Sequence, residues 1–277
     1  MSSIAAHRER YARLIVRSAG PSSRRLIEAF ASIPREQFLG PAPWPVLNGS
    51  GHGPRWTEDP RELYQDVLVG IALERGINNG QPSLHGSCLE ACAPAHGDTA
   101  LHIGAGTGYY TAILAALVGP TGTVLAYEIE PDLAERAREN LVRWPNVRVI
   151  AASACAGALP AADVIYVNAG ATHPVPCWLD ALKPGGRLIF PLTPNEGYGG
   201  MLLVTRRGET RYDAAMLMRV AFIPCAGARD EASARALAAA LDSQPMHIVR
   251  SLRREGPPDD TAWYVGAGGW LSTADAG

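Results

Sequence analysis

The sequence predicts an α/β fold with a doubly wound, mostly parallel sheet of the Rossmann-like type. Short apolar runs alternate with helix-like segments between residues 99 and 191, and this alternation is typical of parallel βαβ units. The first apolar run leads directly into a glycine-rich stretch, Gly104-Ala-Gly-Thr-Gly108, which permits a tight backbone turn at the end of a strand. We expect a helical segment before this sheet and an α+β extension after it.

The region before the sheet is predicted to combine helices with turn-rich pieces. Helices are indicated by apolar residues at helical spacing, and loops by clusters of glycine and proline. In chain order we expect helices at 7–17 and 22–31, an irregular loop at 40–60, an apolar stretch at 67–71, a turn-rich piece at 76–82 and a helix at 84–93.

The sheet itself is predicted from apolar runs of strand length separated by helical patterns. Strands are expected at 99–103, 123–127, 147–151, 163–168 and 187–191, with helices at 109–117, 131–144 and 176–182 between them. Closing antiparallel strands are expected at 201–205 and 216–223, followed by a helix at 231–242 and strands at 246–252 and 261–265.

Composition and charge exclude several function classes. The 277 residues carry 25 basic and 27 acidic side chains, a net charge of −2, so bulk electrostatics does not favour a nucleic-acid partner. No apolar run approaches the length of a membrane span, and we expect no membrane partner. The five cysteines are widely spread without zinc-ligand spacing, so we expect no metal and a reducing, cytoplasmic location. Cys88 and Cys92 share a helix face and are expected in the core.

Three glycines and one acid describe a nucleoside pocket. Gly104, Gly106 and Gly108 follow the first strand, and Glu128 ends the next one. Glycines let the backbone approach a ligand closely, because no Cβ intervenes. A carboxylate at the tip of the second strand can accept hydrogen bonds from both hydroxyls of a ribose.

The glycine spacing selects among nucleoside cofactors. The dinucleotide fingerprint requires G-x-G-x-x-G, and Tyr109 stands where its third glycine belongs. A nicotinamide-dependent oxidoreductase is therefore disfavoured. The G-x-G-x-G order is typical of S-adenosylmethionine-dependent methyltransferases, whose cofactor has no pyrophosphate. The structural alternative is a glycine-rich turn in an unrelated α/β protein.

The order of these pieces resembles the protein-L-isoaspartate O-methyltransferases, roughly from Ser23 to Gly227. Some of the similar segments, such as the glycine loop, occur in many methyltransferases, whereas the two nearest the N-terminus are more specific. The similar segments are Ile33-Pro-Arg-Glu-Gln-Phe38, Gln81-Pro-Ser-Leu-His-Gly-Ser-Cys-Leu-Glu90, the glycine loop, Glu128-Ile-Glu-Pro-Asp-Leu133, Leu182-Lys-Pro-Gly-Gly-Arg-Leu188 and Phe222-Ile-Pro-Cys-Ala-Gly227.

This resemblance implies a Rossmann-like methyltransferase that forms a methyl ester on an isoaspartyl or related carboxylate of a protein, peptide or small molecule. It also implies three parts: an acceptor-side cap at 1–75, a cofactor-binding methyltransferase domain at 76–227 and an extension at 228–277. The expected S-adenosylmethionine-binding residues are Gln81, Gly104, Ala105, Gly106, Thr107, Gly108, Tyr109, Glu128, Ile129, Ser153, Ala154 and Asn168, and the expected catalytic residues are Asn78, Asn79, Gly80 and His85.

The chain departs from the family pattern at two places. The family has Thr-x-Ser beside the methyl acceptor, and this chain has Asn78, Asn79 and Gly80. The family also has an aspartate at the adenine, and Ser153 matches that position. A neutral serine accepts a weaker hydrogen bond than a carboxylate does. We expect cofactor binding to survive these changes, while the preference for an isoaspartyl acceptor is open.

Several alternatives therefore remain. A carboxylate acceptor is already ionised at neutral pH and needs no general base, whereas an amine or hydroxyl would need one, for which His85 is the candidate. His85 could instead pack or contact the cofactor, and Asn78 and Asn79 could be turn formers. The rival functions are a methyltransferase acting on a peptide aspartate or small metabolite, and a catalytically inactive cofactor-binding protein. The sequence indicates no oligomeric state.

Overall fold

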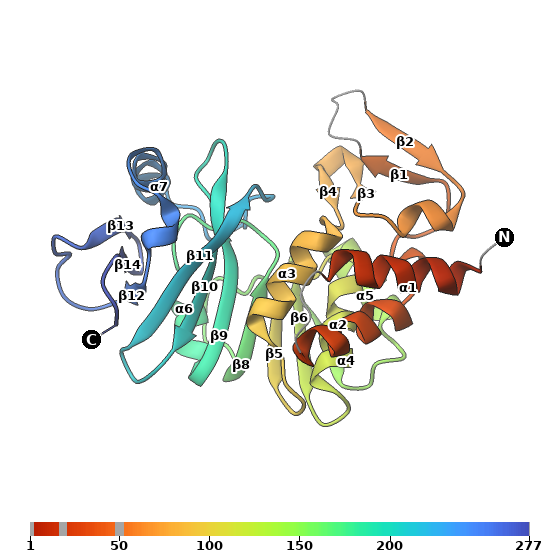
Figure 1. The fold of residues 1–277 in the computed structure, drawn as a ribbon, viewed down its shortest axis with the longest axis horizontal. Coiled ribbons are helices and arrows are strands. Elements are labelled where there is room, and N and C mark those ends of the chain that lie inside the picture. The colour runs from red at the N-terminus through yellow and green to blue at the C-terminus, as the bar shows by residue number, and fades with distance from the viewer. Residues whose placement is uncertain (1–2, 17–20, 48–52, 277) are drawn as a thin grey trace. The chain divides into compact units, whose positions relative to one another are not determined.

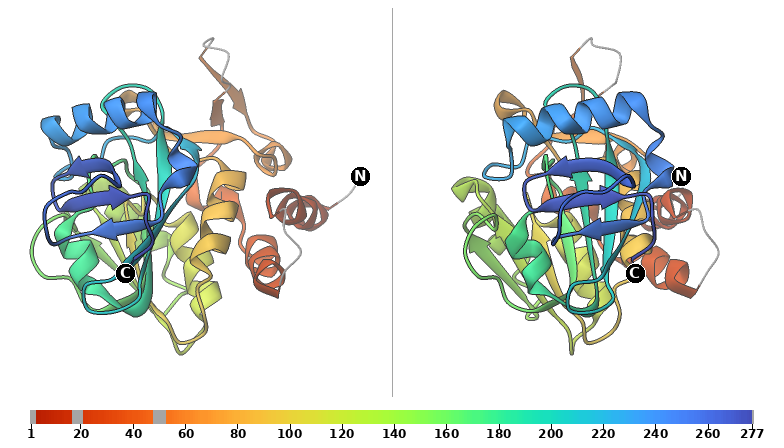
Figure 2. Two further views of the ribbon diagram at one scale, coloured as in Figure 1. Left: turned by 60° about the vertical axis from the view of Figure 1, so that its left-hand side comes forward. Right: turned by 90° about the vertical axis from the view of Figure 1, so that its left-hand side faces the viewer.

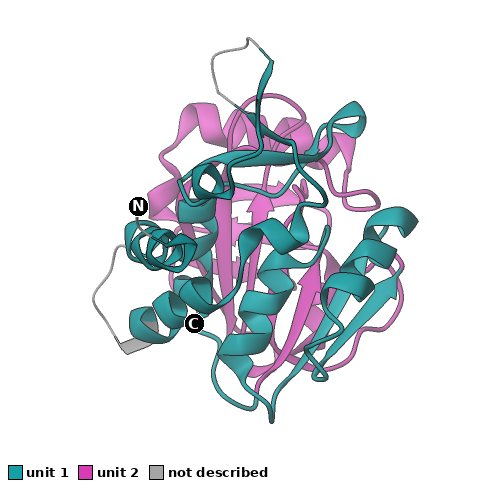
Figure 3. Ribbon diagram, turned by 90° about the vertical axis from the view of Figure 1, so that its right-hand side faces the viewer, with its two compact units in different colours: residues 1–97, 105–151 teal, residues 98–104, 152–277 magenta. Residues whose placement is uncertain are grey.

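The computed structural model describes residues 3–16, 21–47 and 53–276. The chain forms two compact units, shown in separate colours in Figure 3. Unit 1 comprises residues 1–97 and 105–151, and unit 2 comprises residues 98–104 and 152–277. The division of the sequence at residues 75 and 227 stays a prediction about its organisation.

Unit 1 begins with helices that pack against one another (Figure 1). These are α1 (Ile4–Ile15), α2 (Pro21–Ser32) and α3 (Pro82–Cys92). All three were predicted, with ends shifted by up to three residues; residue 17 of the first predicted helix lies outside the described residues. Cys88 and Cys92 are fully buried on α3, which confirms their prediction as core residues.

A small antiparallel sheet occupies part of the region predicted as an irregular loop, so that prediction was wrong. Its order is β2-β1-β3-β4. Trp44 and Val46 of β1 pack with Leu39, Leu63 and Val69 in one buried cluster, and this burial stabilises strands in spite of the surrounding prolines. Residues 48–52 of the predicted loop lie outside the described part of the chain. The strands are β1 (Trp44–Leu47), β2 (Pro54–Thr57), β3 (Leu68–Ala72) and β4 (Ile77–Asn78), with short 3-10 helices at Arg35–Phe38, Pro60–Leu63 and Leu73–Arg75.

The remainder of unit 1 is a parallel strand pair with its helices. Strands β6 (Thr123–Glu128) and β7 (Val147–Ala151) pair in parallel. Helices α4 (Tyr109–Val118) and α5 (Pro131–Asn140) pack on these strands. Helix α5 ends at Asn140, four residues before the end at residue 144 that was predicted from the sequence.

Unit 2 holds the longer series of strands. Strands β5, β8 and β9 pair in parallel, and β9, β10 and β11 pair antiparallel. Together with the β6–β7 pair, they confirm the predicted doubly wound α/β class. Residues 182–186, which precede the strand predicted at 187–191, also belong to β9. The elements are β5 (Thr99–Ile103), β8 (Ala162–Val167), α6 (Pro176–Ala181), β9 (Leu182–Leu192), β10 (Gly199–Arg206) and β11 (Tyr212–Val220).

The C-terminal segment extends the sheet of unit 2 in the order β13-β14-β12-β11. Figure 2 shows helix α7 lying along the last three strands, and α7 contacts β13. The strand predicted at 246–252 was wrong in its first half, where a 3-10 helix (Met246–Ile248) follows Pro245, and β14 was not predicted. The elements are α7 (Glu231–Ser243), β12 (Ser251–Arg253), β13 (Ala262–Gly266) and β14 (Gly269–Ser272). In the described ranges, every helix is too short or too polar to cross a bilayer.

One buried hydrogen bond joins this segment to the loop after β8. The Tyr264 hydroxyl donates to the carbonyl of Thr172 at 2.6 Å, and Tyr264 is almost fully buried. We expect Tyr264→Phe to lower the free energy of unfolding by about 1 kcal/mol, because the carbonyl loses its partner. Denaturant titration would measure this. Tyr198→Phe, at an exposed ring, is the control, and equal stabilities of the two variants would contradict the role of this bond.

Candidate active site

The glycine loop of unit 1 is fastened to the end of β6 by backbone hydrogen bonds. The Gly106 N–H donates to Glu128 Oε2 at 2.6 Å, and the Ala105 N–H donates to the Tyr127 carbonyl at 3.1 Å. The φ angles of Gly106 and Gly108 are +56° and +95°, a region that side chains with a Cβ rarely adopt. The sequence therefore needs glycine here to bring its backbone up to the carboxylate.

Glu128 is a buried carboxylate with capacity left for a ligand. Its other oxygen, Oε1, accepts from the Glu130 N–H at 3.0 Å. Burial raises the pKa of Glu128 above its usual value, and the backbone N–H groups of Glu130 and Gly106 oppose this shift. Each carboxylate oxygen has two lone pairs, so each can accept a further hydrogen bond. A pair of adjacent hydroxyls fits this requirement.

Other predicted cofactor residues of unit 1 differ in what their side chains offer. Tyr109 packs its ring against Phe30 and Phe38 and is buried, so it can meet a ligand only through its backbone. Thr107 is also buried, and its carbonyl accepts from the Asn140 amide. Gln81 donates to Asp66 at 2.9 Å. Ile129, by contrast, is 47% exposed directly after Glu128 and offers an apolar surface.

In unit 2, the structure brings Gly104 and Asn168 together. A Cβ at Gly104 would lie 3.5 Å from the Asn168 carbonyl carbon, and the Asn168 N–H donates to the Ile103 carbonyl at 2.8 Å. The Asn168 amide contacts His102 Nε2 at 2.8 Å. Burial lowers the pKa of His102 to about 3, so this histidine is neutral and holds the Asn168 side chain in place.

Ser153 and Ala154 lie in the segment of unit 2 that follows β7. The Ser153 hydroxyl accepts from the Cys155 N–H at 3.2 Å. The carbonyl of Ala154 accepts from the indole of the buried Trp178 at 2.7 Å. These bonds fix the backbone of the segment, and the Ser153 hydroxyl still has a proton to donate.

The predicted acceptor residues form a tight turn in unit 1. The Asn78 side chain accepts from the Gly80 N–H at 2.9 Å, an Asx turn of the kind that asparagine favours. Gly80, rather than either asparagine, takes the positive φ, +73°. A Cβ at Gly80 would lie 2.0 Å from His85 Nε2. The His85 ring stacks on Tyr110 with centroids 3.7 Å apart, so the imidazole fills the space beside the glycine.

Arg35 belongs to the same surroundings, although sequence reasoning did not name it as a site residue. Its side chain is fully buried. It donates to the carbonyls of Leu63 and Val67 at 2.8 and 2.7 Å, and to Asn79 Oδ1 at 2.7 Å. The one signal in the sequence was its place in the segment Ile33–Phe38, which resembles a family motif.

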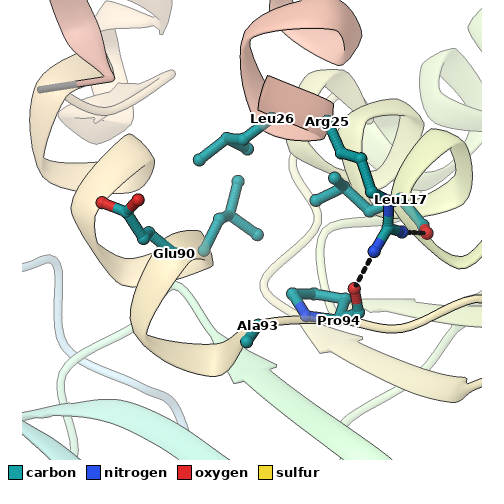
Figure 4. A pocket seen from close by; sticks show the side chains of 7 residues that line it. Arg25, Leu26, Glu90, Ala93, Pro94 and Leu117 are labelled. Atoms are coloured by element: carbon teal, nitrogen blue, oxygen red, sulfur yellow. Dashed lines mark hydrogen bonds between the residues drawn. The ribbon is translucent and has the colours of Figure 1, made fainter. Parts of the chain in front are cut away.

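A pocket elsewhere in unit 1 does not include any predicted site residue (Figure 4). Arg25 points its guanidinium at the carbonyls of Pro94 and Leu117, and Glu90 accepts from the Ser23 hydroxyl. These polar groups are therefore already hydrogen-bonded within the protein. The remaining lining is apolar, from Leu26, Leu89, Ala93 and Pro94, and we assign no ligand to it.

Comparison with known proteins gives one consistent family. The model of the family described as protein-L-isoaspartate(D-aspartate) O-methyltransferase matches residues 53–230. A protein-L-isoaspartate O-methyltransferase of Ignicoccus hospitalis is 32% identical over 206 residues, covering 73% of this chain and 88% of that protein. One from Bradyrhizobium sp. (strain ORS 278) is 33% identical over 215 residues, covering 76% and 90%.

Solved structures agree on the fold. A protein-L-isoaspartate O-methyltransferase superposes with a TM-score of 0.60 at 23% identity, covering 78% of this chain and 65% of that one. A putative protein-L-isoaspartate O-methyltransferase from Plasmodium falciparum, in complex with S-adenosyl-L-homocysteine, gives 0.63 at 19% identity, covering 82% and 100%.

The raised pKa of Glu128 predicts how the affinity for S-adenosylhomocysteine and the stability contribution of Glu128 change with pH. As pH falls through this raised pKa, the carboxylate takes up a proton and loses acceptor capacity, so affinity for S-adenosylhomocysteine should fall. The contribution of Glu128 to the free energy of unfolding of the free protein should change in the opposite direction, because protonation of a group whose pKa is raised by folding favours the folded state. Calorimetric titration and denaturant unfolding across the acid range, each compared between the wild type and Glu128→Gln, would measure the two contributions.

Glu128→Gln should remove both of these contributions and weaken S-adenosylhomocysteine binding roughly 10- to 100-fold, because charge-assisted hydrogen bonds are lost. Glu130→Gln is the matched control, since that side chain pairs with Arg75 instead. Wild-type affinity in the Glu128 variant would exclude Glu128 from the site.

The contact between Gly80 and His85 can be measured by a double-mutant cycle. Gly80→Ala should destabilise the protein by about 1–2 kcal/mol for the positive φ and by more for the collision with the imidazole. Gly76→Ala is the control, because its φ is +68° and a Cβ there would meet nothing within 4 Å. In a His85→Ala background, the cost at Gly80 should drop to that at Gly76; an unchanged cost would disprove the contact.

Proposed function

The chain belongs to the protein-L-isoaspartate O-methyltransferase family, and we propose that it methylates the free carboxylate of isoaspartyl residues in proteins or peptides. The observation that carries this proposal is the family match over residues 53–230, combined with the buried Glu128 carboxylate that accepts a hydrogen bond from the glycine loop. The enzyme is an S-adenosylmethionine-dependent methyltransferase, as its family is.

The residues present fit this cofactor. Glu128 retains lone pairs for two ribose hydroxyls, and Ile129 offers an exposed apolar side chain beside it. Gly104, Gly106 and Gly108 all have positive φ angles, so the glycine loop can turn tightly after β5. In unit 2, Ser153 and Ala154 are the proposed adenine-binding residues, and Asn168 is a further proposed cofactor-binding residue. S-adenosylmethionine supplies an electrophilic methyl group, so the protein has to bind and align the acceptor.

A carboxylate acceptor suits the acceptor turn. The acceptor is ionised at neutral pH and requires no proton transfer, so alignment and exclusion of water can provide the catalysis. Asn78, Asn79, Gly80 and His85 would surround it. His85 is buried and stacked on Tyr110, an arrangement that supports a packing role over that of a general base.

A second acceptor is favoured by one specific observation. The imidazole of His85 fills the space next to Gly80, where the family has a serine side chain, so the acceptor meets a different surface. A peptide aspartate or a small carboxylate is therefore the alternative acceptor.

All five cysteines are free thiols, which supports a reducing compartment such as the cytoplasm.

Methyl-labelled S-adenosylmethionine and a matched pair of peptides, isoaspartyl and aspartyl, test the proposal. We expect base-labile label, released as methanol, from the isoaspartyl peptide only. Label on the aspartyl peptide would select the alternative acceptor. Absence of label from both, with S-adenosylhomocysteine still bound in calorimetry, would refute carboxyl methylation of these peptides.

A further inference from the structure

The Arg35 guanidinium is a buried charge bound only to neutral oxygens. Its three hydrogen bonds go to two carbonyls and one amide oxygen. Among residues 3–16, 21–47 and 53–276, no carboxylate lies within ion-pair distance of it. A buried charge without a counter-charge is costly, so an anionic ligand near Arg35 would be favoured.

Asp66 is the acidic group to consider, because it precedes Val67. Its carboxylate accepts from the backbone and hydroxyl of Ser83 at 2.8 and 2.6 Å, and from Gln81 at 2.9 Å. The Asp66 carboxylate is thus hydrogen-bonded to the N-terminal end of α3. Burial raises the pKa values of Tyr11 and Tyr110. The positive charge of Arg35 opposes this rise, and the negative charge of Asp66 adds to it.

Asn79 connects this charge to the acceptor turn. Its Oδ1 accepts from Arg35 at 2.7 Å and from the Val69 N–H at 3.3 Å, which fixes the side-chain amide. Its Nδ2 is buried and has no hydrogen-bond partner within the described chain, and the same holds for Arg35 Nε and the Tyr110 hydroxyl. Buried donors of this kind call for a hydrogen-bond acceptor, and Asn79 directly precedes Gly80.

We propose that Arg35 orients Asn79 and supplies the positive charge that draws the acceptor carboxylate to the Asn79 amide. This inference rests on the proposed function, because it takes residues 78–80 as the acceptor side. Arg35 is a positioning residue, since it acts through Asn79.

The charge has a kinetic signature. The carboxylate loses its negative charge as it becomes an ester, with S-adenosylhomocysteine as the second product. A nearby cation therefore stabilises the bound acceptor at least as well as the transition state, and its contribution falls on binding rather than on the chemical step. Loss of the charge should raise KM more than it lowers kcat.

Asn79→Asp separates this role from a structural one. Aspartate has the shape of asparagine and gives Arg35 a charge-assisted partner, so a structural role predicts equal or greater stability and an unchanged KM. We expect the stability to be retained and the KM for an isoaspartyl peptide to rise at least about ten-fold, because the new charge cancels that of Arg35. An unchanged KM would overturn the proposal.

Arg35→Lys and Arg35→Met form a second pair. Lysine keeps the charge and methionine keeps the apolar volume, so the lysine variant should have the lower KM of the two. The affinity for S-adenosylhomocysteine should match in both. Equal KM values in correctly folded variants would also overturn the proposal.

Direct binding distinguishes failure of this inference from failure of the proposed function. An isoaspartyl peptide and its isoasparaginyl counterpart differ only in carboxylate against amide. In calorimetry with S-adenosylhomocysteine present, the wild type should prefer the carboxylate about ten-fold, and Asn79→Asp should abolish the preference. That result without methyl transfer would refute the proposed function alone, whereas a wild type without the preference would refute the charge role.

Discussion

The buried guanidinium of Arg35 is the constraint on which the proposed acceptor side of unit 1 depends. It binds the carbonyls of Leu63 and Val67 and the side chain of Asn79, so it joins segments that are far apart in sequence. A buried charge is tolerated only while its hydrogen bonds are made. The chain around residues 63–67 and the turn at 78–80 must therefore be in place together, and the rest of the acceptor side is built on them.

On the proposed cofactor side, the buried charge is negative, and backbone groups stabilise it as they do the positive charge of Arg35. Glu128 is a buried negative charge, and backbone N–H groups of Gly106 and Glu130 hold it, whereas backbone carbonyls hold Arg35. Peptide dipoles thus stabilise both charges, and neither charge has an ion-pair partner among residues 3–16, 21–47 and 53–276. Each charge is left with the capacity to attract a complementary group: hydroxyls at Glu128 and a carboxylate near Arg35. This is a physical basis for bringing a nucleoside and an anionic acceptor to one protein.

Local patterns predicted the parallel strands, their helices and the glycine loop, because strand and helix periods and glycine spacing are visible within a few residues. They failed where long-range packing decides the outcome. Trp44 and Val46 form a strand because they share a buried cluster with Leu63 and Val69, which the nearby prolines conceal. Arg35 was not identified as a site residue for the same reason: its partners lie 28 to 44 residues away. At Gly80, sequence showed the missing side chain but not the imidazole that takes its place.

A crystal structure of the enzyme with S-adenosylhomocysteine and an isoaspartyl peptide is the most direct test of the proposal that Arg35 orients Asn79 and draws the acceptor carboxylate to the Asn79 amide. We expect the peptide carboxylate within hydrogen-bond distance of Asn79 Nδ2 and the ribose hydroxyls on Glu128. A carboxylate bound at a site that Asn79 does not touch, with the ribose still on Glu128, would contradict it.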